Sequence, residues 1–276
     1  MRLTRRLITL LLLGAAVCSA QAPAVPLVPL VPTDHYGPPV CTTGSPPPNR
    51  MSAAKAESIE AAGAADPTAL PSTTPVQNFD IARYRLADYG ACIGNGGCYW
   101  ADLDAQYKRA EAALDRELAL HRHGDKLAIV FDIDETSLSS YCEMQRESFG
   151  YIKPMSNAWV VSPEAAVAIP GALRLFNRAK TAGVDVFFIT GRPASQTAAT
   201  ERNLKAAGFH GWKSLALRNA EEASIPTIAY KSGRRKQILA QGYRIILSVG
   251  DQWSDLNGDP KAEVSVKLPN PFYFLP

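Results

Sequence analysis

Acidic residues directly follow two of the chain's short apolar runs. Asp132 and Asp134 come after the first of these runs, and Asp251 and Asp255 come after the last. Clustered carboxylates repel one another unless a cation or a shared proton lies between them. If a helical turn begins at Asp251, the spacing of four places Asp255 on the same face, and oxygen-rich sites favour Mg²⁺. These residues predict a site for a hard divalent cation, although the Asp-x-Asp pattern alone also occurs in metal sites of glycosyltransferases.

Two further positions offer groups that bind an anionic oxygen. Thr190 and Gly191 provide a hydroxyl and an unobstructed backbone N–H just before an expected helix, although a threonine there can also serve only as the helix cap. Lys231 follows the short apolar stretch 227–229, so we expect it at a strand end, where one cation would offset the carboxylates and hold a phosphate. The three basic residues that follow are expected to be solvated: Arg234, Arg235 and Lys236.

The elements that position these residues alternate along the chain. Short runs rich in branched residues, at 127–131, 184–189 and 245–249, are typical of buried strands. Between them lie helical segments, two of which are expected to begin at Pro170 and Pro193. This alternation predicts a doubly wound α/β fold, a parallel sheet with helices on both faces. Ligand sites of such sheets form beyond the carboxyl ends of the strands, where the polar residues stand.

The first 77 residues read as two segments outside the globular part. Residues 1–20 combine three arginines, an apolar stretch and small residues, which is typical of a cleaved export signal for a periplasmic or secreted protein. A lipidated Cys18 is the alternative, which the bulky Val17 before it disfavours. Residues 21–77 are rich in Pro, Ala and Ser and are expected to form a mostly extended linker, with a short helix near 53–62 as an option.

Composition and cysteine spacing narrow the possible functions. The 29 basic and 26 acidic residues are spread without a polybasic run, so nucleic acid is not an expected partner. Four cysteines remain after the signal, an even number that suits disulfides and lacks the spacing of a zinc site. Cys92 and Cys98 flank a flexible loop that lets them pair, which leaves Cys41 with Cys142. The sequence contains neither the GxSxG motif nor the P-loop lysine motif, which argues against the usual serine hydrolases and nucleotide triphosphatases.

Four motifs in this order resemble those of the haloacid dehalogenase-like hydrolases. They are DIDET at 132–136, ITGR at 189–192, the lysine at 231 and GDxxxD at 250–255. Within that superfamily the chain is similar to the acid phosphatases of classes B and C, relatives of plant vegetative storage proteins. The resemblance covers about residues 78–276, the expected globular domain, whose first long element is a helix at about 100–123.

The resemblance implies a Mg²⁺-dependent phosphomonoesterase acting on small molecules, and it implies a role for each motif residue. Asp132 would attack phosphorus and form an aspartyl phosphate, and Asp134 would serve as general acid and then general base. Mg²⁺ would be bound by the Asp132 carboxylate, the Asp134 main-chain carbonyl and Asp251, with support from Asp255. The phosphoryl oxygens would be held by three groups: Thr190, the Gly191 N–H and Lys231.

Two alternatives to hydrolysis and one open question of substrate remain. A chain of this fold can be a catalytically weak storage or binding protein, and the same intermediate also allows phosphotransfer to an alcohol. Residues 139–168 are too long for a simple crossover, so we expect them to form a small cap over the site. Aromatic side chains of this segment can form the cap's own core, or Tyr151 and Trp159 can stack on a flat leaving group such as a nucleoside or aryl group.

Overall fold

A computed structural model of the chain describes residues 37–41, 51–68, 70, 76–122 and 124–275. The expected export signal at 1–20, with Cys18, lies outside these residues. Within the described part of the chain, no helix combines the length and the apolar character needed to cross a membrane.

The described residues form one five-stranded sheet in which every neighbouring pair of strands is parallel. The strand order is β3-β2-β1-β4-β5, so the chain reverses its direction of winding between β1 and β4. The strands are β1 (Leu127–Phe131), β2 (Asp185–Pro193), β3 (Ser214–Arg218), β4 (Arg244–Gly250) and β5 (Val264–Lys267). A crevice forms where neighbouring strands wind in opposite directions, so the carboxyl ends of β1 and β4 are where a ligand site is expected.

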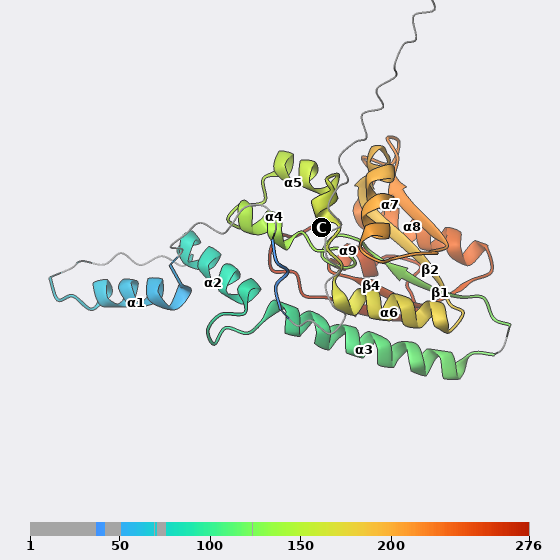
Figure 1. Cartoon of the computed structure of the whole chain (residues 1–276), viewed down its shortest axis with the longest axis horizontal. Coiled ribbons are helices and arrows are strands. Elements are labelled where there is room, and N and C mark those ends of the chain that lie inside the picture. The colour runs from blue at the N-terminus through green and yellow to red at the C-terminus, as the bar shows by residue number, and fades with distance from the viewer. Residues whose placement is uncertain (1–36, 42–50, 69, 71–75, 123, 276) are drawn as a thin grey trace, which may run out of the picture.

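Helices cover both faces of the sheet, as the doubly wound prediction required (Figure 1). Because strand side chains alternate between faces, Ile129 and Phe131 join the larger core, which includes residues of α3 (Tyr99–Leu120) and α6 (Pro170–Thr181). Ala128 and Val130 point the other way and pack with residues of α8 (Thr227–Ala240). The predicted fold class is confirmed.

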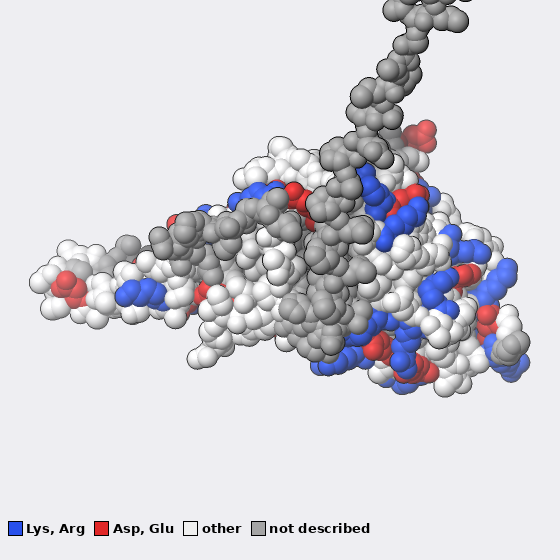
Figure 2. Space-filling view, viewed as in Figure 1, with Lys and Arg blue, Asp and Glu red and all other residues white. Residues whose placement is uncertain are grey.

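The helices α3 and α6 lie side by side and are joined by ion pairs. Arg174 Nη2 lies 2.5 Å from Asp104 Oδ1, and Arg178 Nη2 lies 2.6 Å from Asp115 Oδ2. On the face shown in Figure 2, basic and acidic side chains are accordingly interspersed over these helices. The charges of these side chains are therefore balanced by ion pairs between the two helices.

Two helix starts differ in how well the sequence predicted them. Helix α6 begins at Pro170, as expected. Helix α7 (Thr197–Ala206) begins later than Pro193, because β2 continues through Pro193 and a short 3₁₀ helix, η2 (Ala194–Gln196), intervenes. The prediction that the strand ends at residue 189 was wrong for a physical reason: the pairing of β2 with β3 shifts register after Ile189 and resumes at Pro193.

The segment expected to be an extended linker contains a helix, α1 (Ala53–Ala64), so the optional helix near 53–62 is confirmed. The Ser52 hydroxyl caps its first turn by accepting a hydrogen bond from the Lys55 N–H at 3.3 Å. Helix α1 packs on α2 (Phe79–Ala91), where the Ala53 N–H donates to Asp88 Oδ2 at 2.8 Å. These contacts explain why low hydrophobicity did not leave this segment extended. In Figure 1 the two helices project from the sheet domain.

Residues 139–168, expected to form a cap, contain three short helices: α4 (Tyr141–Arg146), α5 (Lys153–Val160) and η1 (Pro163–Ala165). Backbone hydrogen bonds close the base of the segment, from Ser139 N to Val167 O at 2.9 Å and from Ile169 N to Ser137 O at 3.0 Å. The segment therefore leaves and rejoins the domain at nearly the same place.

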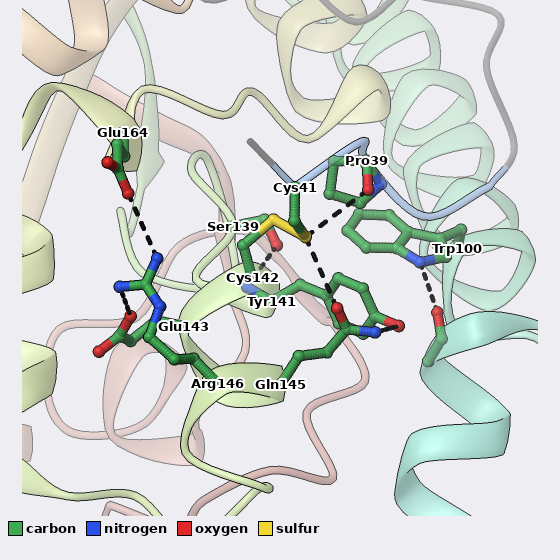
Figure 3. The surroundings of a disulfide bond; sticks show 11 residues. Pro39, Cys41, Trp100, Ser139, Tyr141, Cys142, Glu143, Gln145, Arg146 and Glu164 are labelled. Atoms are coloured by element: carbon green, nitrogen blue, oxygen red, sulfur yellow. Dashed lines mark hydrogen bonds and ion pairs between the residues drawn. A yellow bond between two sulfur atoms is a disulfide. The ribbon is translucent and has the colours of Figure 1, made fainter. Parts of the chain in front are cut away.

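Both predicted disulfides are present, Cys92–Cys98 and Cys41–Cys142. The second connects the arm at residues 37–41 to α4, across a sequence separation of 101 residues (Figure 3). Beside it, the Trp100 indole N–H donates to the Gly90 carbonyl at 2.9 Å. The N-terminal arm is thereby attached covalently to the segment next to the candidate site.

Candidate active site

A cavity of about 470 Å³ lies at the carboxyl ends of β1, β2 and β4. Its lining includes all nine residues that the sequence singled out: Asp132, Asp134, Tyr151, Trp159, Thr190, Gly191, Lys231, Asp251 and Asp255. A second cavity of about 330 Å³, between β2, β3 and α8, is lined by none of them. The topology therefore brings together residues that are up to 123 positions apart, from 132 to 255.

Asp132 stands at the end of β1 in a fixed backbone position. Its N–H donates to the Val249 carbonyl at 3.1 Å, and its carbonyl accepts from the Ser137 hydroxyl at 2.6 Å. The side chain is buried, and Lys231 Nζ lies 2.5 Å from Asp132 Oδ1 and 2.5 Å from Asp255 Oδ1. One ammonium group thus bridges two buried carboxylates.

The placement of Lys231 at a strand end was wrong. The stretch 227–229 is the first turn of α8, which begins directly after Pro226, so Lys231 projects from a helix. An apolar run of three residues is too short to distinguish a strand from a helix. The helical spacing appears only in buried positions that follow, Lys231, Arg235 and Ile238, at intervals of four and three residues.

Arg235 was also misjudged, since it is fully buried rather than solvated. Its Nη1 donates to the Asp255 carbonyl at 2.6 Å and its Nε to the Pro260 carbonyl at 2.8 Å. Arg234 is partly exposed and pairs with Glu222 at 2.7 Å, whereas Lys236 is exposed as expected. Arg235 therefore holds the backbone of the segment that carries Asp255.

Asp134 is held by Arg192, a residue to which the sequence had given no role. Arg192 Nη2 donates to Asp134 Oδ1 at 2.6 Å, and Arg192 Nε to Asp134 Oδ2 at 3.0 Å. The guanidinium is buried, which acts to lower its pKa, but Asp134 outweighs this effect and raises it. The fork geometry fixes the direction of the Asp134 carboxylate. Arg192 ends the ITGR motif, and its position there was the available signal.

Asp251 is fully enclosed and accepts three side-chain hydrogen bonds. They come from the Thr136 hydroxyl at 3.0 Å, Gln252 Nε2 at 2.7 Å and Asn270 Nδ2 at 2.7 Å. Asn270 lies in an irregular segment after β5, where no strand or helix pattern marks it. Its contribution to the site could not be found from the sequence.

The helix that was expected from Asp251 begins two residues later, as α9 (Trp253–Leu256). Asp255 is the third residue of this helix, and its Oδ2 accepts from the Gln252 N–H at 2.7 Å. A Cβ at position 250 would lie 2.3 Å from the Asp255 Cβ, so Gly250 permits this close approach. Asp251 and Asp255 do not share a helix face, yet carboxylate oxygens of both lie within 4.8 Å of each other and of one from Asp132.

Thr190 and Gly191 lie in the last part of β2 and not at a helix start. The Thr190 hydroxyl accepts from the Arg192 N–H at 3.2 Å, and the cap position of α7 is occupied by Gln196. The alternative of a simple helix cap is therefore wrong. A Cβ on Gly191 would meet nothing within 4 Å, so the side-chain direction at this position faces open space.

Glu135 is a second residue that the sequence reasoning missed. It is buried with a left-handed φ of 50°, and its carboxylate accepts from the Ser140 N–H at 2.6 Å and the Tyr273 hydroxyl at 2.7 Å. It thus joins the base of the cap segment and the C-terminal segment to the loop after Asp134. Its place beside two aspartates was a signal, but its partners are not visible in the sequence.

Three buried acids of the site have raised pKa values. Burial raises the pKa of Asp132 well above its usual range, although Lys231 opposes this. Burial and the nearby Asp255 raise the pKa of Asp251 to about 6, and burial with Asp134 raises that of Glu135 to about 7. Crowded carboxylates in a low dielectric retain protons unless a cation offsets their charge.

Tyr151 and Trp159, the two candidates for stacking on a flat leaving group, have different environments. Tyr151 is 42% exposed, and its ring lies 5.6 Å from that of Tyr273, so one edge of it is available to a ligand. Trp159 is buried against Cys142 and Ala165, although part of it lines the cavity. The other aromatic residues of this segment, Tyr141 and Phe149, belong to the larger core.

Comparison with known protein families shows which family the chain belongs to. The family described as HAD superfamily, subfamily IIIB (acid phosphatase), matches residues 49–276. The chain belongs to this family. The resemblance drawn from the four motifs is confirmed, and the match extends N-terminally beyond residue 78 to include α1.

Three known plant proteins are similar to parts of the chain. A stem 31 kDa glycoprotein of Glycine max is 37% identical over 167 residues, which cover 59% of this chain and 63% of that protein. Acid phosphatase 1 of Solanum lycopersicum is 36% identical, covering 53% and 58%. Vegetative storage protein 1 of Arabidopsis thaliana is 33% identical, covering 53% and 55%. The chain therefore spans less than two thirds of the length of these relatives.

A solved structure supports the fold. The class C acid phosphatase from Bacillus anthracis, determined with tungstate bound, superimposes with a TM-score of 0.53 at 24% sequence identity. The alignment covers 70% of this chain and 86% of that one. It shows that the parallel sheet and its helices share the fold of that structure.

The residues present suit a divalent cation, which acid phosphatases of this family are expected to use. Three buried carboxylates, from Asp132, Asp251 and Asp255, offer oxygens close enough to share one ion. Lys231 supplies one positive charge to two of them, and Asp251 receives only neutral donors. A hard cation would relieve the remaining repulsion and allow these carboxylates to ionise.

Proposed function

We propose that the protein is a Mg²⁺-dependent acid phosphatase that hydrolyses small phosphate monoesters through an aspartyl phosphate on Asp132. The observation that supports this most is the bridging of buried Asp132 and Asp255 by Lys231 within a cavity that also holds Asp251. This arrangement unites a nucleophile, an anion-binding cation and a metal-binding carboxylate.

Asp132 begins the reaction by attacking phosphorus. The bond from a carboxylate oxygen to phosphorus forms as the bond to the leaving oxygen breaks. Asp134, oriented by Arg192, gives its proton to the departing alkoxide. Lys231, the Thr190 hydroxyl and the Gly191 N–H hold the phosphoryl oxygens as charge spreads over them.

Hydrolysis of the intermediate reverses these roles. Asp134 accepts a proton from a water molecule, whose oxygen attacks phosphorus and releases the Asp132 carboxylate and inorganic phosphate. One acidic side chain thereby serves both half-reactions and returns to its starting state. The ion pair with Arg192 keeps the Asp134 carboxyl directed at the same place in each half.

Mg²⁺ would be held by the Asp132 carboxylate, the Asp134 main-chain carbonyl and Asp251, with Asp255 in support. When bound, it offsets the repulsion between the phosphate dianion and the attacking carboxylate. Asp255 supports the site indirectly, since its two oxygens receive Lys231 Nζ and the Gln252 N–H.

Tyr151 is the candidate for recognising a flat leaving group, such as a nucleoside or an aryl group. Its exposed ring beside Tyr273 supports this role, whereas Trp159 is better explained as part of the cap's own core. We also propose export to the periplasm or the exterior. Two disulfides in the described residues support an oxidising compartment.

Turnover of para-nitrophenyl phosphate tests the proposed function. We expect activity that EDTA abolishes and Mg²⁺ restores, and that Asp132→Asn removes. Turnover that survives metal removal contradicts the Mg²⁺ proposal. A storage or binding protein would show nothing above the Asp132→Asn control. Addition of an alcohol and analysis of the products separate hydrolysis from phosphotransfer.

A further inference from the structure

Three metal-binding side chains meet at the amino edge of the sheet, opposite the edge that carries Asp132. Glu117 and His121 are one turn apart at the end of α3, and Glu263 directly precedes β5. A carboxylate oxygen of each glutamate and a ring nitrogen of His121 lie within 4.8 Å of one another. The acid phosphatase reaction uses none of these residues.

The ring of His121 is held in one orientation. Its side chain is only 3% exposed, and Nδ1 lies 2.7 Å from the Glu117 main-chain carbonyl. Because a carbonyl oxygen only accepts, Nδ1 carries the hydrogen, and the other nitrogen of the neutral ring has a lone pair. A backbone hydrogen bond of this kind is the usual partner of the distal nitrogen in a metal-binding histidine.

The second nitrogen faces an oxygen that is also an acceptor. His121 Nε2 is buried and has no hydrogen-bond partner, and the nearest carboxylate oxygen, Glu263 Oε2, lies 3.6 Å away. Glu263 cannot easily turn aside, since its Oε1 accepts from Arg244 Nε at 2.9 Å and pairs with Arg244 Nη2 at 2.8 Å. Two lone pairs therefore point at the same space, an arrangement that a cation between them would stabilise.

The spacing and the charge both suit one metal ion. Nitrogen and oxygen ligands at about 2.0–2.1 Å from a tetrahedral Zn²⁺ lie about 3.3 Å apart, close to the observed separation. Glu117 and Glu263 are negative and Arg244 is positive, so the cluster carries net negative charge when His121 is neutral. An imidazole nitrogen selects for borderline metals, whereas the oxygen-only cluster at Asp132 suits Mg²⁺.

We propose that Glu117, His121 and Glu263 form a binding site for a divalent transition metal of the Zn²⁺ class, with water completing the coordination. The ion links the end of α3 to the start of β5 and so stabilises the amino edge of the sheet. It takes no part in the chemistry at Asp132. A protonated His121 paired with Glu263 is the competing explanation.

Metal titration of the EDTA-treated full chain tests this proposal. Excess Mg²⁺ occupies the carboxylate cluster at Asp132, and Zn²⁺ binding is then measured by calorimetry at pH 7.5, with Co²⁺ absorption reporting tetrahedral geometry. We expect one equivalent of Zn²⁺, a higher melting temperature on binding, and an affinity at least about 100-fold weaker in His121→Ala. His210→Ala, which removes an exposed histidine, is the matched control and should bind as the wild type does.

Two results would overturn the proposal. One is Zn²⁺ binding of equal affinity in wild type, His121→Ala and Glu117→Gln, the last of which is a milder change in case the first variant folds poorly. The other is a wild type that binds no Zn²⁺ but loses stability relative to His121→Gln as the pH rises from 5 to 8, which identifies a protonated His121. Phosphatase activity with Mg²⁺ is measured in parallel, so failure of either proposal is seen separately.

Discussion

The two edges of the sheet differ in how their acids are neutralised. At the carboxyl edge, Asp132 and Asp255 are less than a tenth exposed and share the single ammonium of Lys231. At the amino edge, the side chain of Asp185 is 34% exposed. Asp185 accepts from the Tyr243 hydroxyl at 2.6 Å and lies 3.7 Å from Lys213 Nζ.

The acids at the carboxyl edge are those to which we assign the proposed chemistry, whereas Asp185 at the amino edge is partly exposed to solvent. An exposed carboxylate is solvated by water, and its ion pair contributes little to folding. Buried carboxylates that share one cation are unfavourable, and such an arrangement persists where a ligand or metal compensates for it. Equivalent substitutions at the two edges should therefore have unequal effects.

The largest contrast is expected between two lysines. Lys231→Met should lower the free energy of unfolding by about 3–5 kcal/mol, because it leaves two buried carboxylates without their cation. It should also abolish phosphatase activity, since the phosphate loses its cation. Lys213→Met, at the amino edge, should leave both quantities unchanged. Urea unfolding and steady-state kinetics measure them, and equal effects of the two changes would refute the contrast.

Two aspartates extend the comparison to catalysis. Asp134→Asn should lower kcat by about 10² to 10⁴-fold, because it removes the general acid and base of both half-reactions. Asp185→Asn should leave kcat unchanged, as its hydrogen bond from Tyr243 lies at the other edge. Single-turnover kinetics resolve formation and hydrolysis of the intermediate. A variant of Asp134 slowed in only one of these steps would show that a different group serves the other.

Metal-dependent stability should vary with pH. The folded-state pKa of Asp251 is about 6 and that of Glu135 about 7, above their ordinary values of 3.8 and 4.5. A raised pKa means that these groups contribute stability below about pH 4 and lose it as the pH rises through 6 and 7. In EDTA the melting temperature should therefore fall between pH 4.5 and 7.5.

Mg²⁺ should offset that fall, so its stabilising effect should be larger at pH 7.5 than at pH 4.5. Thermal unfolding with EDTA or Mg²⁺ at the two pH values measures it. Asp251→Asn should reduce the effect of Mg²⁺ at pH 7.5. An increment from Mg²⁺ that is the same at both pH values would be inconsistent with carboxylates that ionise on metal binding.

The smallest effect is expected at the rim of the cavity. Tyr151→Ala should lower kcat/KM for a nucleoside monophosphate, by an amount equivalent to about 1–3 kcal/mol of transition-state stabilisation if stacking is as strong as base–aromatic stacking elsewhere. It should have little effect on kcat/KM for glycerol phosphate. Trp159→Ala should lower the melting temperature without changing this preference, because its ring packs inside the cap. If both variants lose activity equally on both substrates, the aromatic residues are structural only.

The acidic residues at the carboxyl edge of the sheet could be predicted, because the strands before them can be recognised in the sequence. Asp132 and Asp251 each follow a run of branched residues, and parallel strands bring their carboxyl ends together. The position of Lys231 could not be predicted, because three apolar residues fit a strand or a helix equally well. Helix α1 in the linker could be predicted only as an option, because composition does not report contacts such as that of Ala53 with Asp88.

Some hydrogen bonds at the site could not be predicted from the sequence, because they join segments that only the fold brings together. Arg192 and Glu135 lie inside recognised motifs, but their contacts with Asp134 and Tyr273 depend on how separate segments approach one another. Asn270 has no local pattern at all, although it donates to Asp251. Such hydrogen bonds are set by tertiary packing, which no local pattern encodes.

Rapid-quench labelling tests whether an aspartyl phosphate forms on Asp132 during turnover. The enzyme is mixed with a phosphate monoester labelled in its phosphoryl group, in the presence of Mg²⁺, and is quenched in acid within milliseconds. We expect labelled protein that hydroxylamine releases, with the label on Asp132 and none in Asp132→Asn. Turnover by a wild type that never carries label, or label that persists in Asp132→Asn, would contradict it.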